Sequence, residues 1–356
     1  MTFVPTTGTS PAGAAPGPTG TLRMTPGRWV ALAVAVPVAL ALIGWTGFDL
    51  VTTFARGSYA FSDAIPVHDG KVAVNVTAGN ITLRQGPAGV ASASPGGTLS
   101  ASPTPTSASG AWLTGVVQYG LIRPSVSEYN TGTTANIGVG CDAIAAGNCG
   151  VNANLDVPAN TAVTLWSNGG DIEVSGFSND MTLSAEGGNV TASNLTGDLK
   201  LDTGGGDLTG TGLTGQINIT AEGGNVSTSN LDGTRGTIMI ATGGGDLTAN
   251  SVTGSSVSFL AEGGNISGEG VAAPRATIES GGGDVTLAFA VAPQNLQIEA
   301  EGGNVTVILP PGSTKYNIIA NTEGGNSNIE PSLLNPKSGD KISIQSGGGD
   351  ITVGQS

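Results

Sequence analysis

Apolar and polar residues alternate in short runs over most of the C-terminal half of the chain, and glycine pairs separate these runs. Ile217 and Ile219 alternate with polar residues before one such pair. A period of two predicts β-strands with one buried face. Counting by twos from Ile217 reaches Asn225, yet the next apolar residue is Val226. The chain must therefore bend or bulge at the glycine pair, because a straight strand would turn Asn225 inward.

The glycine pairs recur with a period close to twenty residues. Ten cassettes of the form Gly-Gly-(Asp or Asn)-apolar are present, with Ser327 in the apolar place of one, and their steps are 18, 18, 18, 21, 19, 19, 20, 22 and 24 residues. We define the Asp or Asn of each cassette as its corner residue. The corner residues are Asp171, Asn189, Asp207, Asn225, Asp246, Asn265, Asp284, Asn304, Asn326 and Asp350.

A second turn signal, such as Leu213-Thr214-Gly215, closes each repeat. A unit of strand, corner, strand and turn cannot bury its own apolar face, so it must stack on its neighbours. The pattern predicts an all-β, β-helix-like solenoid. The residues expected in its core include Ile219, Leu247, Phe259, Val285 and Ile298.

The corner residues alternate in type along the chain. A glutamate precedes the glycine pair in the Asn cassettes, whereas most Asp cassettes carry a third glycine there. Stacked strands are about 4.8 Å apart, so a continuous column of carboxylates would repel itself. Alternation staggers these charges, and it fails once in sequence order, between Asn304 and Asn326. The half-repeat Ser346–Val353 is expected to end the stack, either with an open strand edge or covered by the segment Pro331–Lys341.

The N-terminal part of the chain has a different organisation. Residues 1–28 are rich in Pro, Gly, Thr and Ala, which predicts a disordered tail. Residues 29–48 contain no charge and would span about 30 Å as a helix, which predicts a transmembrane segment. Arg23 and Arg28 precede it, so we expect a cytoplasmic tail, a single-pass protein of the cell membrane and a C-terminal domain outside. A cleaved signal peptide is the alternative.

The remaining segments complete the expected domain plan. A tether is expected at 49–66, and an N-terminal β cap region at 67–158 with a disordered, Pro- and Ser-rich insertion at 86–110. The Gly-Gly-Asp/Asn solenoid is expected over 159–356. Its charge is strongly negative, because residues 150–356 hold 21 acids and 6 bases (−15) while residues 1–149 hold 5 acids and 6 bases (+1). We therefore expect no nucleic-acid partner.

Few residues suggest chemistry. Cys141 and Cys149 predict a disulfide in an exported domain, with two free thiols as the alternative. The glycine cassettes lack the Lys-Ser/Thr of a phosphate loop. The glycine cassettes also resemble calcium-binding nonapeptide repeats, but Asn replaces Asp in half of the cassettes. No catalytic, cofactor or metal residues are predicted. His68 is the only histidine, and it has no partner motif.

The repeated Gly-Gly-Gly-Asp and Glu-Gly-Gly-Asn motifs, between short alternating strands and behind a predicted membrane helix, resemble the bacterial putative-adhesin β-strand-repeat family. The resemblance covers about residues 67–356. The run from Arg28-Trp29 to Ile43-Gly44-Trp45 looks like the anchor of actinobacterial, membrane-anchored members of this group of unknown function. The resemblance implies a right-handed or similar β-solenoid and an adhesive or envelope-structural role. It brings no catalytic residues.

The leading functional hypothesis is a non-enzymatic, membrane-tethered envelope protein. Its acidic β-solenoid would be presented for adhesion or envelope interaction, to a surface polymer or a protein ligand. A carbohydrate-active enzyme on a β-helix scaffold is one alternative, because solenoids can hold paired carboxylates in a groove. Such an enzyme should place acids outside the repeat pattern, but most acids here fall at the repeat corners and only scattered ones lie elsewhere. Glu173, Glu279 and Glu299 are such acids. A cation-binding structural scaffold is the other alternative.

Overall fold

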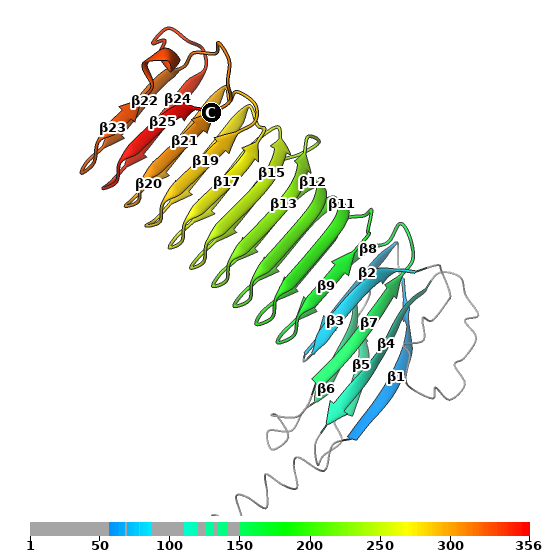
Figure 1. The fold of residues 1–356 in the computed structure, drawn as a ribbon. Coiled ribbons are helices and arrows are strands. Elements are labelled where there is room, and N and C mark those ends of the chain that lie inside the picture. The colour runs from blue at the N-terminus through cyan, green and yellow to red at the C-terminus, as the bar shows by residue number, and fades with distance from the viewer. Residues whose placement is uncertain are drawn as a thin grey trace, which may run out of the picture. The chain divides into compact units, whose positions relative to one another are not determined.

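Each repeat folds as one coil of two strands joined by a glycine corner (Figure 1). The computed structural model describes residues 57–67, 70–77, 79–86, 110–119, 125–131, 134–140 and 150–356. We call the strand that leads into a corner the entry strand and the strand that leaves it the exit strand. β10 (Met181–Ala185) is an entry strand, and β11 (Val190–Thr203) contains its exit strand and the next entry strand. The bend expected at the glycine pairs is confirmed, since each is a bend between strands.

Stacked entry strands form one sheet, and stacked exit strands form another. The entry sheet contains, in spatial order, β5 (Ser125–Thr131), β6 (Thr134–Gly140), β2 (Lys71–Val76), β8 (Ala162–Ser167), β10, the second part of β11, the second part of β12 (Leu208–Ala221), β14 (Ile238–Thr242), β16 (Val257–Ala261), β18 (Arg275–Ser280), β20 (Asn295–Ala300), β24 (Lys341–Ser346) and β22 (Asn317–Thr322).

The exit sheet contains, in spatial order, β1 (Gly57–Pro66), β4 (Gly110–Tyr119), β7 (Gly150–Val157), β3 (Asn80–Gln85), β9 (Ile172–Ser175), the first part of β11, the first part of β12, β13 (Val226–Gly233), β15 (Leu247–Gly254), β17 (Ile266–Val271), β19 (Val285–Phe289), β21 (Val305–Leu309), β25 (Ile351–Gln355) and β23 (Ser327–Ile329). The pairs β1–β4, β4–β7 and β5–β6 are antiparallel, and the other pairs are parallel.

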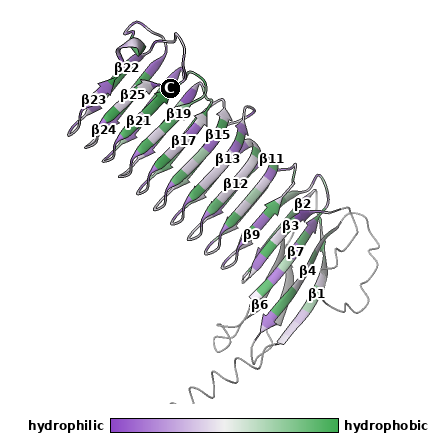
Figure 2. Ribbon diagram, viewed as in Figure 1, coloured by the Kyte–Doolittle hydropathy of each residue, from purple (hydrophilic) through white to green (hydrophobic). Residues whose placement is uncertain are grey.

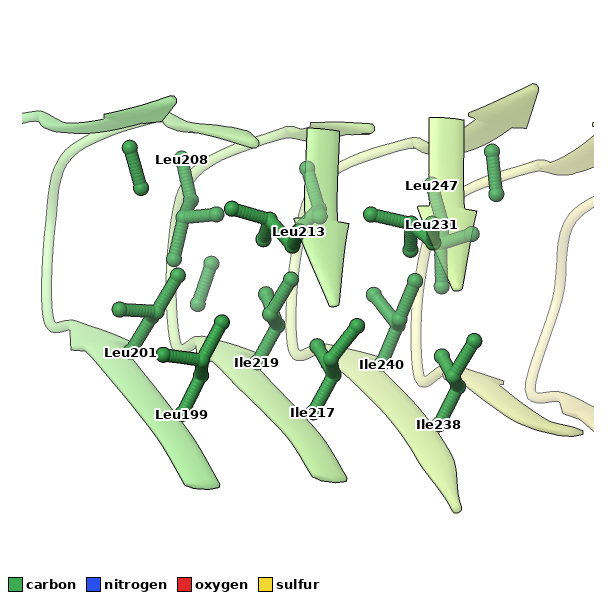
Figure 3. Packing of buried hydrophobic residues seen from close by; sticks show 14 of the residues in the cluster. Leu199, Leu201, Leu208, Leu213, Ile217, Ile219, Leu231, Ile238, Ile240 and Leu247 are labelled. Atoms are coloured by element: carbon green, nitrogen blue, oxygen red, sulfur yellow. The ribbon is translucent and has the colours of Figure 1, made fainter. Parts of the chain in front are cut away.

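The core lies between the two sheets. Inward residues of the entry strands, such as Leu201 and Ile219, face inward residues of the exit strands, such as Leu208 (Figure 3). The alternation of hydrophobic and hydrophilic residues along the strands is visible in Figure 2. The core residues predicted from the alternation are confirmed, with exposed fractions of 0–1%: Ile219, Leu247, Phe259, Val285 and Ile298. Burial of successive layers by one another is what makes the solenoid continuous.

Strand β1 corrects the tether expected at 49–66. Gly57–Pro66 pairs along its whole length with β4 in antiparallel register. Tyr59 and Phe61 pack against the core, and Ile65 is buried. The short alternation of these apolar residues therefore forms a strand, and the tether prediction is wrong for residues 57–66.

The C-terminal coil is not the end of the stack, so the expectation that the half-repeat Ser346–Val353 ends it is wrong. β24 lies between β20 and β22, and β25 lies between β21 and β23. The end layer is instead formed by β22, β23 and the 3₁₀ helix η1 (Pro331–Leu333). The chain passes over one layer after β21 and then returns to fill it. Segment 331–341 is therefore the return connection, and Leu333 within it is buried.

Several predictions fall outside the described residues. They are the cytoplasmic tail, the transmembrane segment at 29–48, His68, the Cys141–Cys149 disulfide and all but the end residues of the insertion at 86–110. No membrane-crossing helix is found in the part of the chain that the structure describes. The disulfide and the membrane anchor stay predictions.

Candidate functional site

A ladder of Asp and Asn side chains runs along the glycine corners. The backbone N–H of Asn189 donates to Oδ1 of Asp171 at 2.8 Å, and the N–H of Asp207 donates to Oδ1 of Asn189 at 2.8 Å. The same bond joins each later pair of layers. In spatial order the ladder contains Asn80, Asp171, Asn189, Asp207, Asn225, Asp246, Asn265, Asp284, Asn304, Asp350 and Asn326. The structure thus brings together all ten corner residues named from the sequence and adds Asn80.

The alternation of Asp and Asn is unbroken in space, although it fails in the sequence. Asp350 lies between Asn304 and Asn326, because its N–H donates to Asn304 and its Oδ1 accepts from Asn326. The Nδ2 of Asn225 also donates to Oδ1 of Asp207, at 3.2 Å. Each ladder carboxylate therefore has an uncharged amide on either side. This places ladder carboxylates two layers apart, about 10 Å, which is close to the screening length at 0.1 M salt.

The Asp layers also carry a buried hydroxyl at the corner. Oγ1 of Thr203 donates to the carbonyl of Gly188 at 2.8 Å and accepts from the N–H of Gly206 at 3.2 Å. Ser or Thr occupies this place in the Asp layers and in the end layer, Val76 occupies it in the Asn80 layer, and Ala occupies it in the other Asn layers. The hydroxyl residues are Ser167, Thr203, Thr242, Ser280, Ser346 and Thr322, and the alanines are Ala185, Ala221, Ala261 and Ala300. The chemical repeat of the solenoid is therefore two coils long.

Close approach of the layers explains two of the three glycines in an Asp layer. A Cβ at Gly206 would lie 2.1 Å from the carbonyl oxygen of Gly188, and a Cβ at Gly204 would lie 2.4 Å from that of Glu186. Neither position accepts a side chain without a backbone shift. A Cβ at Gly205 would meet nothing closer than 3.9 Å. The Asn layers have Glu at the position that Gly204 occupies in its Asp layer. The Gly-Gly-Gly-Asp and Glu-Gly-Gly-Asn motifs therefore differ because an Asp layer and an Asn layer contact the layer before them in different ways.

From the Asp171 layer to the end layer, one exposed carboxylate per layer lines the corner side of the solenoid. The Asp layers supply the ladder Asp, and the Asn layers supply the Glu before the glycine pair. In spatial order this acidic edge consists of Asp171, Glu186, Asp207, Glu222, Asp246, Glu262, Asp284, Glu301, Asp350 and Glu323. Such a row attracts cationic groups along its length. The described residues contain no cluster of three or more metal-ligating side chains, so the edge is a row rather than a cage.

The outer face of the entry sheet contains a hollow of about 400 Å³ beside the acidic edge. It is lined by Asn75, Trp166, Ser167, Asn168, Ser184 and Glu186. Asn75, Trp166 and Ser184 are in register on β2, β8 and β10, so they stand side by side on the outer face. The Trp166 side chain is exposed, with 39% of its surface open to solvent.

A second hollow of about 390 Å³ lies on the same face and extends to β12. Thr164, Thr182, Lys200 and Asn218 line it in register on successive strands. It also holds the carboxylates of Asp180 and Asp198. The second hollow is thus lined by hydroxyl, amide and charged groups from several layers.

Two charged residues of the second hollow, Asp180 and Lys200, make bonds within the protein. The N–H of Asp198 donates to Oδ1 of Asp180 at 3.0 Å. Lys200, which also lines the hollow, has its Nζ 2.7 Å from Oδ2 of Asp202. One of the two aspartates is therefore already engaged by the backbone of the other.

The acids outside the repeat pattern do not converge on one site. Glu279 and Glu299 are in register on β18 and β20, while Glu173 lies on β9 of the exit sheet. Sequence reasoning missed Trp166. A signal was available, because Trp166 stands between Leu165 and Ser167, in the outward phase of its strand, where the alternation calls for a polar residue.

One of the comparisons with known proteins identifies a family, a domain of unknown function. The family model described as Toastrack DUF4097 matches residues 152–355, more than half of the chain. No curated protein matches. The chain is similar to a crystal structure described as a "putative cell adhesion protein" from Clostridium sporogenes ATCC 15579. The two are 11% identical with a TM-score of 0.23, over 84% of this chain and 100% of that chain.

Proposed function

The chain belongs to the Toastrack DUF4097 family, and from that premise we propose that it is a non-enzymatic adhesion protein of the cell envelope. Residues 29–48 tether it to the cell membrane, and residues 57–356 stand outside. The solenoid offers its acidic edge and the outer face of its entry sheet to surface polymers or to other proteins. The uncharged twenty-residue span behind Arg23 and Arg28 supports the tether.

The observation that carries this proposal is the unbroken order of the corner layers. Asp and Asn alternate in space along the whole ladder, including the layers that are out of sequence order. The carboxylates of the acidic edge follow from this repeat, so they form a row and do not converge on a point. A row of carboxylates that repeats every two coils suits a repetitive ligand, as the extended faces of stacked coils do generally.

A carbohydrate-active enzyme is the second candidate, and one observation favours it. The second hollow contains two carboxylates, Asp180 and Asp198, as glycoside hydrolysis requires. Against it, Oδ1 of Asp180 is engaged by the backbone N–H of Asp198. A structural role in the stack accounts for that bond, so the binding protein remains the better supported function.

Protease treatment of intact spheroplasts tests the tethered arrangement. The solenoid should be removed while the membrane stays closed, because residues 49–356 are expected outside. Loss of the solenoid only after permeabilisation would mean that the orientation is reversed. Recovery of the whole chain in the soluble fraction of broken cells would contradict the tether.

Charge variants test the presentation of the acidic edge. The double variant Glu222→Gln/Glu262→Gln removes two edge charges and leaves the ladder bonds intact. Glu173→Gln/Glu269→Gln is the matched control, since it removes two charges from the exit sheet, which the proposal does not assign to the ligand. Retention of the full-length chain on insoluble cell-wall material should fall in the first variant and stay unchanged in the control. Equal retention in both would contradict a role for the edge.

A further inference from the structure

Trp166 is an unusual residue for its position on the solenoid. Its register neighbours on the outer face of the entry sheet are Asn75 and Ser184, both small and polar. Single exposed apolar residues are common on protein surfaces, so exposure alone carries no function. Here the indole also forms one wall of a hollow of about 400 Å³, and polar groups surround it.

Unpartnered amide oxygens provide the second observation. Oδ1 of Asn75, in the Trp166 hollow, is buried and has no hydrogen-bond partner among the described residues. Oδ1 of Asn218, a residue of the second hollow, is also buried and has no hydrogen-bond partner among the described residues. A buried acceptor without a donor is destabilising, so native structures nearly always supply one. Each hollow is therefore lined by an amide residue whose oxygen receives no donor from the described part of the chain.

The side chains that line the Trp166 hollow indicate the class of ligand that it can bind. The flat indole accepts an apolar ring face. The Glu186 carboxylate accepts hydrogen bonds from hydroxyl groups, and the Ser184 hydroxyl and the amides of Asn75 and Asn168 can donate as well as accept. A pyranose ring has both features, a C–H face and a rim of hydroxyls. The Glu186 carboxylate repels anionic polymers, whereas the charge of the nearby Asp202 is paired with Lys200.

We propose that Trp166 is the stacking platform of a binding site for a neutral surface polysaccharide. One sugar ring lies on the indole with its hydroxyls directed to Asn75 and Glu186. The chain continues over β10 and β11 into the second hollow, where it meets Thr182 and Asn218. Ligand sites commonly combine one apolar wall with a few placed polar groups in this way. The inference deepens the proposed function and rests on it, since it names the polymer class and its place.

Titration of the full-length chain with neutral polysaccharides tests the site. The probes are laminarin, dextran and chitohexaose, with alginate as an anionic control, followed by tryptophan fluorescence and calorimetry. At least one neutral probe should bind, and alginate should not. Trp166→Ala should weaken that binding by about tenfold or more, whereas Trp166→Phe, which keeps a stacking ring, should weaken it less.

Met239→Ala is the matched control, because Met239 is also an exposed apolar residue on the outer face of the entry sheet but lines neither hollow. It should bind as the unchanged chain does. Ser184→Gln, which fills the hollow, serves as a second variant should Trp166→Ala fail to fold, and it too should lose binding. The melting temperature of each variant separates lost binding from lost folding.

The contrary outcomes distinguish this site from the wider proposal. Unchanged binding by both Trp166→Ala and Ser184→Gln would overturn the site while leaving a polymer-binding envelope protein. Absence of binding to every neutral probe, with the chain still retained on insoluble cell-wall material, would overturn the neutral-sugar site alone. No retention on that material either would overturn the proposed function itself. Binding of an oligolysine peptide that Trp166→Ala abolishes would show a basic-peptide site and overturn the sugar.

Discussion

The variant Asn225→Asp probes the reason for the alternation of corner residues. Asn225 lies in the ladder between Asp207 and Asp246, which belong to the layers on either side. The substitution replaces the amide between these two carboxylates with a third carboxylate. Oδ1 of the new side chain can still accept the N–H of Asp246, as Asn225 does at 2.9 Å. The bond that is lost is the one from Asn225 Nδ2 to Asp207 Oδ1, which is 3.2 Å long and exposed. The substitution therefore changes charge while it leaves the backbone ladder in place.

The expected cost follows from the layer spacing. Two unit charges about 4.8 Å apart in water repel each other by about 0.9 kcal/mol. The new carboxylate has such a neighbour on each side, so repulsion lowers the free energy of unfolding by about 2 kcal/mol at low salt. At 1 M salt the screening length falls to about 3 Å, which removes most of this term. The lost hydrogen bond adds about 0.5–1 kcal/mol that does not depend on salt.

Denaturant unfolding at low and high salt measures both contributions. Asn225→Asp should be destabilised by about 2–3 kcal/mol at low salt and by about 1 kcal/mol or less at 1 M salt. Asn321→Asp is the matched control, since this exposed residue has the uncharged Gln345 as its register neighbour and should change stability little. A salt-independent cost in Asn225→Asp, or an equal cost in the control, would refute the charge argument.

Three further predictions concern stability. Ile219→Asp buries an unpaired charge in the core and should cost several kcal/mol in denaturant unfolding, and an unchanged unfolding curve would contradict the assigned inward face. Gly206→Ala should lower the free energy of unfolding by about 2 kcal/mol or more, whereas Gly205→Ala should change it little, because only the Cβ at position 206 would lie against a carbonyl oxygen. Equal effects of the two substitutions would contradict the close approach of the layers. The hydrogen bond from the Ser332 hydroxyl, and then the one from the backbone N–H of Gln355, hold the pKa of Glu330 below its ordinary value of 4.5. The ionised carboxylate therefore stabilises the end layer above pH 4.5, and this contribution is lost as the pH falls through the lower pKa of the folded state. Hydrogen exchange of the Gln355 amide should rise over that pH range in the unchanged chain but not in a Glu330→Gln variant.

Much of the solenoid could be predicted because its signals are local. The alternation around Ile219 assigns the inward face, and the glycine period marks the corners, since both depend on strand geometry over a few residues. The strand β1 was missed because its alternation of Tyr59, Phe61 and Ile65 is short and follows a segment expected to be a tether. An isolated strand is decided by its partner, here β4, which lies far along the chain.

The layer order and the hollows could not be predicted in the same way. Sequence order says nothing about which layer a returning chain fills, and the break in alternation between Asn304 and Asn326 was the one trace of the inserted Asp350 layer. The Trp166 hollow depends on side chains from β2, β8 and β10, which the chain separates by long intervals. Its formation requires the register between strands, and periodicity alone does not provide that register.

The central claim, a solenoid that binds an envelope polymer without cleaving it, is tested most directly by following the polymer itself. The purified full-length chain is incubated for long periods with the neutral polysaccharide that it retains best, and the size distribution and the reducing ends of the polymer are measured before and after. The account predicts saturable retention with both quantities unchanged. Shortening of the polymer, abolished by Asp180→Asn or Asp198→Asn, would contradict it and establish the enzyme instead.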